Sequence, residues 1–240
     1  MKRNETIKFI ILRSIGNFLL LFAIFGVIAT FGPALYYEVQ FQVIKARGVN
    51  FKVANESSAL GELTKKQKGQ SVSFGDLLTG SKEQTIVPPD TEFSIVIPKL
   101  GASARVFANV DPSDESKFLP VLQNGVAHAQ GSLFPGLAGN IYLFAHSADN
   151  FWNAGQYNAI FYLIKDLEKG DEVVVFYQGK RYNYFVTDSR IVEPEDVSFI
   201  TEANTGNEQL ILQTCWPPGT TWKRLLVFAR PRKTDTIFKQ

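Results

Sequence analysis

The sequence predicts a mostly-β domain, folded as a closed or nearly closed barrel and preceded by one membrane-spanning helix. Three observations lead to this fold class. Residues 14–37 form an apolar run without a charged side chain, close to the N-terminus. From residue 91 onward, short apolar or alternating runs are separated by turn residues, and few stretches have helical spacing. Because separate strands leave exposed edges, a barrel that closes on itself is the favoured arrangement.

The first 37 residues predict a cytoplasmic basic N-terminus, residues 1–13, followed by a transmembrane anchor, residues 14–37. At 1.5 Å per residue, the 24 positions of the apolar run extend about 36 Å, which exceeds a hydrocarbon core of about 30 Å. The basic residues that precede the run, against the single acid Glu5, are Lys2, Arg3, Lys8 and Arg13. By the positive-inside rule, this end lies in the cytoplasm and the chain after residue 38 lies outside the cell.

A cleaved signal peptide is the alternative reading of the apolar run. Such a peptide has an apolar region of only about 7–15 residues and a small-residue cleavage site, and no good site follows Ala29. An uncleaved anchor is therefore favoured, with Pro33 expected to end or kink the helix.

Residues 38–90 predict a polar stalk or linker that separates the anchor from a β-barrel domain at residues 91–240. The stretch is rich in Ser, Lys, Gln and Pro, and it carries only one short helical pattern, near Phe74–Leu78.

Within residues 91–240, strands alternate with tight turns. Strands are predicted at Phe93–Ile97, Ala104–Phe107, Asn140–Ala145, Glu172–Tyr177, Arg181–Ile191, Gln209–Thr214 and Arg224–Ala229. Gln178-Gly179-Lys180 predicts the turn of a hairpin. Helices are predicted at Glu115–Leu122 and Tyr157–Leu167.

The composition favours a folded domain and argues against a nucleic-acid-binding protein. Hydrophobic residues make up 45% and charged residues 20% of the chain, and the net charge is only +2. Cys215 is the only cysteine, so no internal disulfide forms. One cysteine and two histidines do not make a zinc site without further ligands.

Three residues with complementary chemistry stand at predicted strand ends. Cys215 follows the strand Gln209–Thr214, and Arg224 opens the next strand after a loop that contains Pro217-Pro218-Gly219. If these strands are antiparallel neighbours, Cys215 and Arg224 face each other across the mouth of the loop. His146 ends another strand and is also expected at the barrel rim.

These residue types suit acyl transfer by a thiol. A histidine assists ionisation of the thiol, whose ordinary pKa is about 8.5, and then protonates the departing amine. A guanidinium stabilises the oxyanion of the tetrahedral intermediate. Each residue also has a plainer reading: an inert buried thiol for Cys215, a core histidine for His146 and a surface ion pair for Arg224.

Three ordered motifs resemble the sortase family. The central sortase stretch is similar to Gly125-Val126-Ala127-His128, followed by Gly131, Pro135-Gly136 and Gly139-Asn140, which leads into Ile141–His146. The signature in which Thr precedes the catalytic Cys is similar to Leu212-Gln213-Thr214-Cys215. The arginine at the head of the final strand is similar to Arg224-Leu225-Leu226-Val227. The resemblance covers residues 92–231. A departure follows His146, where many sortases carry Arg and this chain has Ser147, so the sortase class is left open.

The resemblance implies a closed eight-stranded barrel and a cysteine transpeptidase. Cys215 is then the nucleophile, His146 the general acid and base, and Arg224 the oxyanion stabiliser, while Thr214 supports the substrate or the oxyanion. The implied substrates are secreted proteins with a C-terminal LPXTG-like sorting motif, and the implied acceptor is an amine on the cell wall or on another surface protein. The implied location is the cell membrane, with the catalytic domain outside.

Two side chains compete for parts of these roles. His128 is the only other histidine, but the resemblance gives it no chemical step. Asp149 is a candidate to orient the imidazole of His146, but a solvated loop carboxylate is the favoured interpretation. Aromatic residues flank the motifs and either line a substrate groove or pack over the barrel end: Phe151, Trp152, Trp216 and Trp222.

No metal or other cofactor is predicted. Some sortases bind calcium through loop acids, and ordinary surface turns explain the acids that are available here, which are Asp166, Glu168, Asp171, Glu193, Glu195 and Asp196. Two other functions remain open from the residues alone. One is a membrane-bound cysteine endopeptidase, in which water resolves the thioester, and the other is a non-catalytic peptide-binding barrel.

Overall fold

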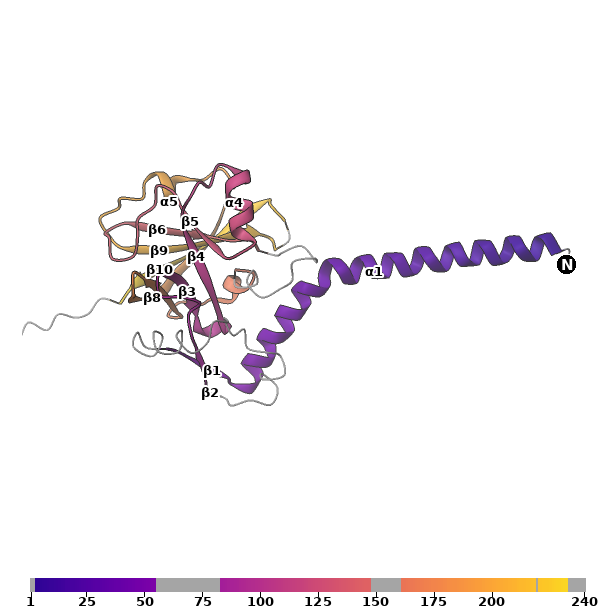
Figure 1. Ribbon diagram of the computed structural model, residues 1–240, viewed down its shortest axis with the longest axis horizontal. Coiled ribbons are helices and arrows are strands. Elements are labelled where there is room, and N and C mark those ends of the chain that lie inside the picture. The colour runs from indigo at the N-terminus through magenta and orange to yellow at the C-terminus, as the bar shows by residue number, and fades with distance from the viewer. Residues whose placement is uncertain (1–2, 55–82, 148–160, 219, 233–240) are drawn as a thin grey trace, which may run out of the picture.

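The computed structural model of the chain describes residues 3–54, 83–147, 161–218 and 220–232. Eight strands close into one barrel in the order β10-β8-β7-β3-β4-β5-β6-β9 (Figure 1). The bounds are β3 Phe93–Ile97, β4 Ala102–Val110, β5 Val126–Ala129, β6 Asn140–Phe144, β7 Glu172–Tyr177, β8 Lys180–Val192, β9 Gln209–Trp216 and β10 Lys223–Pro231. The predicted fold class, a mostly-β closed eight-stranded barrel with a few short helices after an N-terminal helix, is confirmed.

Each strand predicted from the sequence is present, and several are longer than predicted. The β7–β8 hairpin turns at Gln178 and Gly179, which both have positive φ, 51° and 75°. Two such residues make the tight turn whose twist suits a hairpin. The strand β5 was not predicted, because its four residues, Val-Ala-His-Ala, show neither alternation nor a run of β-branched side chains.

Two of the barrel pairings are parallel, β4 with β5 and β6 with β9. A parallel neighbour requires a crossover connection. Between β4 and β5 the crossover contains α4, Glu115–Leu122, at the bounds predicted for a helix. Between β6 and β9 the chain passes through β7 and β8. The parallel pairing brings the carboxyl ends of β6 and β9 to the same edge of the barrel. His146 lies two residues after the end of β6, and Cys215 is the second-last residue of β9.

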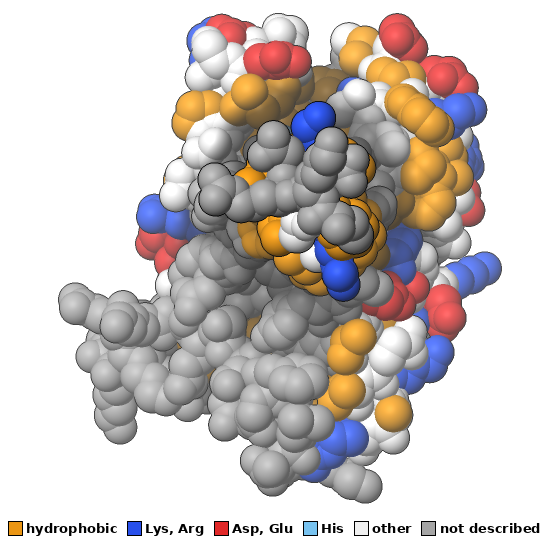
Figure 2. Space-filling model, turned by 90° about the vertical axis from the view of Figure 1, so that its right-hand side faces the viewer, with side chains coloured by type: hydrophobic (Ala, Val, Ile, Leu, Met, Phe, Trp, Pro, Cys, Tyr) orange, Lys and Arg blue, Asp and Glu red, His pale blue; other side chains and the backbone are white. Residues whose placement is uncertain are grey.

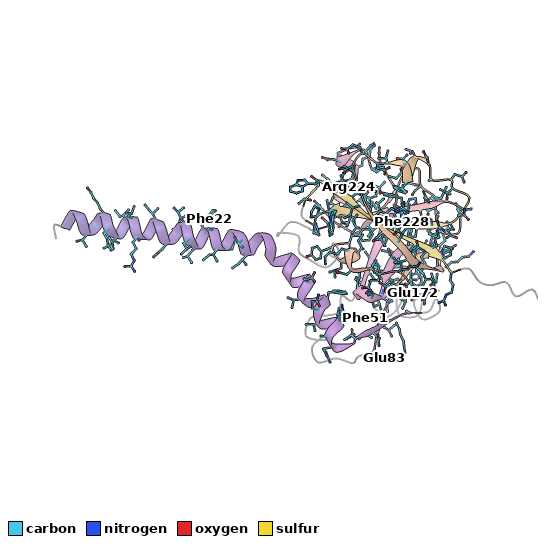
Figure 3. All side chains as sticks on the ribbon, turned by 180° about the vertical axis from the view of Figure 1, so that it is seen from behind. Phe22, Phe51, Glu83, Glu172, Arg224 and Phe228 are labelled. Atoms are coloured by element: carbon cyan, nitrogen blue, oxygen red, sulfur yellow. The ribbon has the colours of Figure 1, made fainter. Side chains whose placement is uncertain are left out.

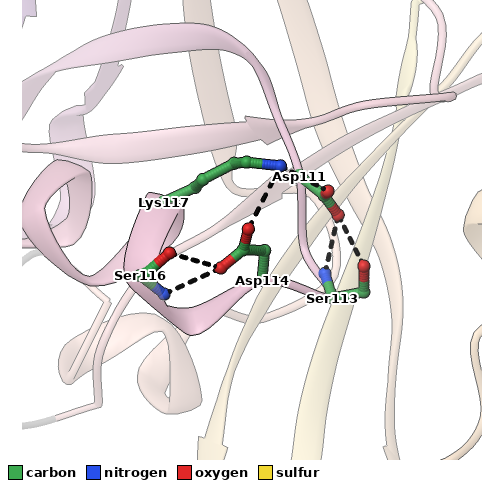
Figure 4. A network of polar contacts seen from close by, with 5 residues as sticks. All are labelled: Asp111, Ser113, Asp114, Ser116 and Lys117. Carbon is green, nitrogen blue, oxygen red and sulfur yellow. Dashed lines mark hydrogen bonds and ion pairs between the residues drawn. The ribbon is translucent and has the colours of Figure 1, made fainter.

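A polar network fixes the start of α4 (Figure 4). The Asp114 carboxylate accepts hydrogen bonds from the backbone N–H and the hydroxyl of Ser116, at 3.0 and 2.6 Å. Lys117 forms ion pairs with both Asp111 and Asp114, at 3.2 and 3.1 Å. This cap satisfies a backbone donor that the first turn of a helix leaves without an intrahelical partner.

The N-terminal helix α1 spans Arg3–Arg47 and includes one segment long and apolar enough to cross a membrane, Thr6–Ile28. Viewed nearly along α1, apolar side chains surround the helix (Figure 2). A helix that is apolar on all sides suits a lipid environment. The helix does not end at Pro33 but continues to Arg47, and Figure 1 shows it changing direction near the barrel.

The last part of α1 packs against the barrel. Phe41 is 5% exposed and belongs to the main apolar core, which includes side chains from all eight barrel strands. Glu38 forms an ion pair with Lys165 at 3.1 Å, and Ile44 packs against Val49. These contacts explain why the helix continues beyond Pro33, since the additional turns bury an apolar face.

The stretch predicted as a polar stalk, residues 38–90, differs from a simple spacer where the structure describes it. Two short strands, β1 Asn50–Val53 and β2 Glu83–Ile86, pair in parallel. Ala54 and Ile86 pack against Val96, Val174 and Phe176 of the barrel in a second apolar cluster. The helical pattern near Phe74–Leu78 lies outside the described residues.

The helix predicted at Tyr157–Leu167 is wrong in its described part. Residues 161–167 contain only a 3₁₀ helix, η3 Leu163–Asp166. Leu167 is extended, and the Glu168 N–H donates to the Asp171 carboxylate at 2.6 Å. The chain therefore turns toward β7 before a longer helix is completed. Two further short helices are η1 Pro98–Leu100 and α5 Ser198–Thr201.

Candidate active site

Cys215 and Arg224 lie directly opposite each other on neighbouring strands. β9 and β10 are antiparallel, with Cys215 in register with Arg224 and Gln213 in register with Leu226. Directly opposed residues point to the same face of a sheet, with Cβ atoms about 4.5–5.5 Å apart. Both Cys215 and Arg224 are partly exposed. The antiparallel pairing expected from the sequence is confirmed.

The strand that leads to His146 pairs with the other side of β9. In the parallel β6–β9 pair, Phe144 is in register with Gln213, and the Ala145 N–H donates to the Gln213 carbonyl at 3.1 Å. His146 follows two residues after the end of β6, and on β9 Cys215 follows two residues after Gln213. The thiol therefore lies on the middle strand of three, between the strand that leads to the imidazole and the strand that carries the guanidinium.

These residues share the outer face of the barrel, which two short helices partly cover. Because side chains alternate along a strand, Phe144 and Gln213 lie on the same face as His146 and Cys215. Phe118 of α4 packs edge-on against Phe144, with ring centroids 6.0 Å apart. Further along this face, Phe199 of α5 packs against Phe228 at 5.3 Å. The exposed end of the face is the row that contains Cys215.

The Arg224 side chain is held by backbone carbonyls. Its Nη1 donates to the carbonyl oxygens of Thr221 and Lys223, at 3.0 and 3.1 Å. The planar guanidinium carries further N–H donors on Nε and Nη2, which suit an anionic oxygen. Figure 3 shows Arg224 at the opposite end of the domain from Phe51 and Glu83, so the β1–β2 pair does not cover it.

The sortase-domain family model matches residues 95–232 of this chain. The matched region contains the whole barrel except the first two residues of β3, and with it Cys215, His146 and Arg224.

The chain belongs to the sortase family.

The individual relatives described next share 22–29% sequence identity with this chain. Sortase D of Bacillus subtilis (strain 168) is 29% identical over 137 residues, which are 56% of this chain and 60% of that protein. This sortase thus matches about three fifths of the length of that relative. Among solved structures, sortase C-1 of Actinomyces oris is 26% identical over 58% of this chain and 70% of its own, with a TM-score of 0.47. A lid mutant of sortase A from Corynebacterium diphtheriae is 22% identical over 85% of this chain and 97% of its own, with a TM-score of 0.49.

Thr214, the residue before Cys215, is buried. Its side chain is 2% exposed and lies on the opposite face of β9 from Cys215. The hydroxyl donates to the Ala145 carbonyl at 3.2 Å. In this sortase the hydroxyl ties β9 to the residue that precedes His146, and the expectation that Thr214 supports the substrate or the oxyanion stays a prediction.

His128 is a structural residue on β5. Its ring is fully buried and stacks on Phe134, with centroids 4.4 Å apart. Nδ1 accepts from the Asn109 N–H at 3.3 Å, and Nε2 lies 3.0 Å from the Leu133 carbonyl and from the Ser132 hydroxyl. Burial lowers the pKa of His128 below its ordinary value. A neutral ring with both nitrogens bonded is poorly placed to move protons, which favours His146 as the base.

Tyr142 and Gln213 form a polar pair that the sequence reading did not single out. Both lie on the face of Cys215, and the Tyr142 hydroxyl donates to Gln213 Oε1 at 2.6 Å. Burial raises the pKa of Tyr142, an effect opposed by nearby Arg224 and reinforced by Asp196. The signal available in the sequence was the polar Gln213 within an apolar strand, two residues before the lone cysteine.

Lysines neutralise three of the acids considered as calcium ligands. Lys99 pairs with Glu168 and Asp171 at 3.1 and 2.8 Å, and Lys165 pairs with Asp166 at 2.7 Å. Within the described residues, no group of three or more His, Cys, Asp or Glu side chains is arranged to hold a metal ion. The absence of a cofactor stays a prediction.

The remaining sequence candidates are not part of the described Cys215 row. Asp149, Phe151 and Trp152 lie outside the described residues. Trp216 packs against the main core, and Trp222 is 73% exposed.

Proposed function

We propose that this sortase is a cysteine transpeptidase that cleaves an LPXTG-like sorting motif in secreted proteins and transfers the acyl group to an amine. The placement of Cys215 between the strands of His146 and Arg224 carries the proposal. A scaffold that only binds peptides does not require a thiol, an imidazole and a guanidinium at the open end of one face.

In the first half-reaction, the Cys215 thiolate attacks the main-chain carbonyl carbon of the threonine in the motif. The new C–S bond pushes the carbonyl electrons onto oxygen, and the Arg224 guanidinium donates hydrogen bonds to that oxyanion. As the oxyanion collapses, the C–N bond breaks and His146 gives its proton to the departing amine. The products are a thioester on Cys215 and a free amine fragment.

In the second half-reaction, an incoming amine resolves the thioester. Neutral His146 accepts a proton from the amine as its nitrogen attacks the thioester carbonyl. A new amide bond forms, the C–S bond breaks, and the sulfur leaves as thiolate. Thiolate and imidazolium are thereby restored together, so no external acid or base is consumed.

The N-terminal helix supports a location at the cell surface. In this proposal α1 spans the membrane with its basic end in the cytoplasm, which leaves the barrel outside the cell. Secreted proteins with a sorting motif are then the acyl donors, and an amine on the cell wall or on another surface protein is the acceptor. The chemistry uses no metal.

The test uses the full-length chain in lipid nanodiscs, with fluorogenic LPXTG-like peptides in the presence and absence of triglycine. We expect a ligated peptide product with triglycine and a peptide adduct on Cys215 by intact mass. Cys215→Ala abolishes both products, and Lys52→Ala, at an exposed position of the β1–β2 pair away from Arg224, serves as a surface control. Hydrolysis without ligation for every amine tried would favour an endopeptidase. No adduct and no turnover with any peptide would contradict the proposal.

A further inference from the structure

The row of side chains next to Cys215 consists of Phe144, Gln213 and Leu226, so it contains one polar side chain between two apolar ones. Gln213 lies two residues before Cys215 on the same face of β9, at a distance of about 7 Å along the strand. Its neighbours in register are Phe144 on β6 and Leu226 on β10, which are 6% and 0% exposed. Gln213 itself is partly exposed. An amide at this position is therefore accessible from the catalytic face.

The Gln213 amide has a fixed orientation. Tyr142 is 3% exposed, and its hydroxyl donates to Gln213 Oε1 at 2.6 Å. Because the phenol is buried, it stays protonated and keeps donating this bond. With Oε1 engaged by Tyr142, Gln213 offers its two Nε2 hydrogens as donors for a ligand.

The next row on this face is already covered. The Phe199 ring of α5 packs on Phe228, which is in register with Ile211 in that row. One row further along, Asn140 donates from Nδ2 to the Phe199 carbonyl at 3.1 Å. A peptide that lies along the face from Cys215 thus reaches the Gln213 row but not the row beyond it. An extended peptide advances about 3.3 Å per residue, so the second residue before the acylated one lies at the level of Gln213, about 7 Å from Cys215.

We infer that Gln213 is a substrate-positioning residue, whose Nε2 donates a hydrogen bond to the main-chain carbonyl oxygen of the second residue before the acylated one. Tyr142 holds the amide in the orientation that this bond requires. The inference rests on the proposed function, because it assumes that a peptide acylates Cys215. The acyl part of the peptide is the part that remains bound through both half-reactions, so a contact there aligns the carbonyl in each.

The experiment is a double-mutant cycle on the full-length chain in nanodiscs. One partner is the protein, unaltered or Gln213→Glu, and the other is the peptide, ordinary or with a thioamide in place of that single carbonyl. A thioamide sulfur is the weaker acceptor. Glutamate keeps the shape and the acceptor for Tyr142 but lacks the Nε2 donors. Gln213→Leu is a second variant without donors, and melting curves of each variant verify folding.

We expect the thioamide to lower kcat/KM about tenfold in the unaltered chain and by less than about twofold in Gln213→Glu and Gln213→Leu. Tyr142→Phe keeps the donors but frees the amide, so we expect an intermediate ratio. Gln209→Leu, on the same strand and face but about 13 Å from Gln213 and about 20 Å from Cys215, serves as the matched control and keeps the tenfold ratio.

The outcomes separate this inference from the proposed function. If Gln213→Glu keeps the full discrimination, or the unaltered chain shows none while still forming the Cys215 adduct, Gln213 does not contact that carbonyl and only this inference is overturned. If no peptide acylates the unaltered chain, the proposed function fails, and this inference fails with it.

Discussion

The substitution Arg224→Lys tests the proposed oxyanion stabilisation most directly. In the structure, Nη1 of Arg224 is occupied by the Thr221 and Lys223 carbonyls, which fix the plane of the guanidinium. Nε and Nη2 are then the donors left for the oxyanion. A lysine has a single nitrogen, so it either keeps the backbone contacts or turns toward the substrate, and it does not present a rigid pair of donors.

The expected loss follows from this geometry. Removal of one oxyanion donor typically lowers kcat by about 10²–10³, or about 2.7–4 kcal/mol. Lysine retains the positive charge, so we expect the lower end of the range, about a 100-fold decrease in kcat. KM changes by less than about twofold, because the oxyanion exists in the transition state and not in the bound substrate.

The assay measures kcat and KM for ligation of the best peptide to triglycine, with Arg230→Lys as the matched control. Arg230 lies on the same strand, about 20 Å from Arg224, and is exposed. Retention of more than about a third of kcat in Arg224→Lys would refute the oxyanion role. A rise in KM at unchanged kcat would instead assign Arg224 to ground-state binding.

Four further predictions concern stability, docking of α1 and metals. Burial lowers the pKa of His128 in the folded protein, so the unfolded chain binds a proton more readily. The stability present above about pH 6.5 is therefore lost as the pH falls below that value. His128→Gln is expected to reduce the change in melting temperature between pH 7 and pH 5. A Cβ at Gly139 would clash with Leu133 Cδ1 and the Ala203 carbonyl, so Gly139→Ala lowers stability by about 1–3 kcal/mol, measured by urea unfolding, and an unchanged midpoint contradicts the packing. Phe41→Ala removes an apolar contact of α1 with the barrel, so trypsin is expected to cleave near Arg47 several-fold faster than in the unaltered chain. Equal cleavage rates would show that this contact is dispensable. Addition of EDTA or calcium leaves the ligation rate within about twofold, because lysines already neutralise the loop acids, and a larger response would reveal a metal dependence.

Much of the barrel could be predicted because its strands carry local signals. Glu172–Tyr177 is a continuous run of β-branched and aromatic residues, and it forms β7 at those bounds. Elements without such signals were missed. β5 has four mostly small residues, and the parallel β1–β2 pair joins segments on either side of residues 55–82. β5 is held by its pairing with β4 and β6, and the β1–β2 pair by packing against the barrel, neither of which local propensity reveals.

The candidate site likewise has features that local sequence predicts and features that only the tertiary structure shows. The single cysteine, its position at a strand end and the arginine at the head of the next strand are local features, and a short loop between consecutive strands implies their pairing. The sequence by itself therefore determined the nucleophile candidate, its pairing with Arg224 and the apolar N-terminal helix.

Only the tertiary structure decided how distant segments meet. The parallel register of β6 and β9 brings the strand that leads to His146 beside the strand that carries Cys215, although the two residues are 69 positions apart. The same register places the Thr214 hydroxyl on the Ala145 carbonyl and the Tyr142 hydroxyl on Gln213. A shift of one residue would turn every side chain of a strand to the other face, and strand register between distant segments is set by packing and backbone hydrogen bonds that no local pattern encodes.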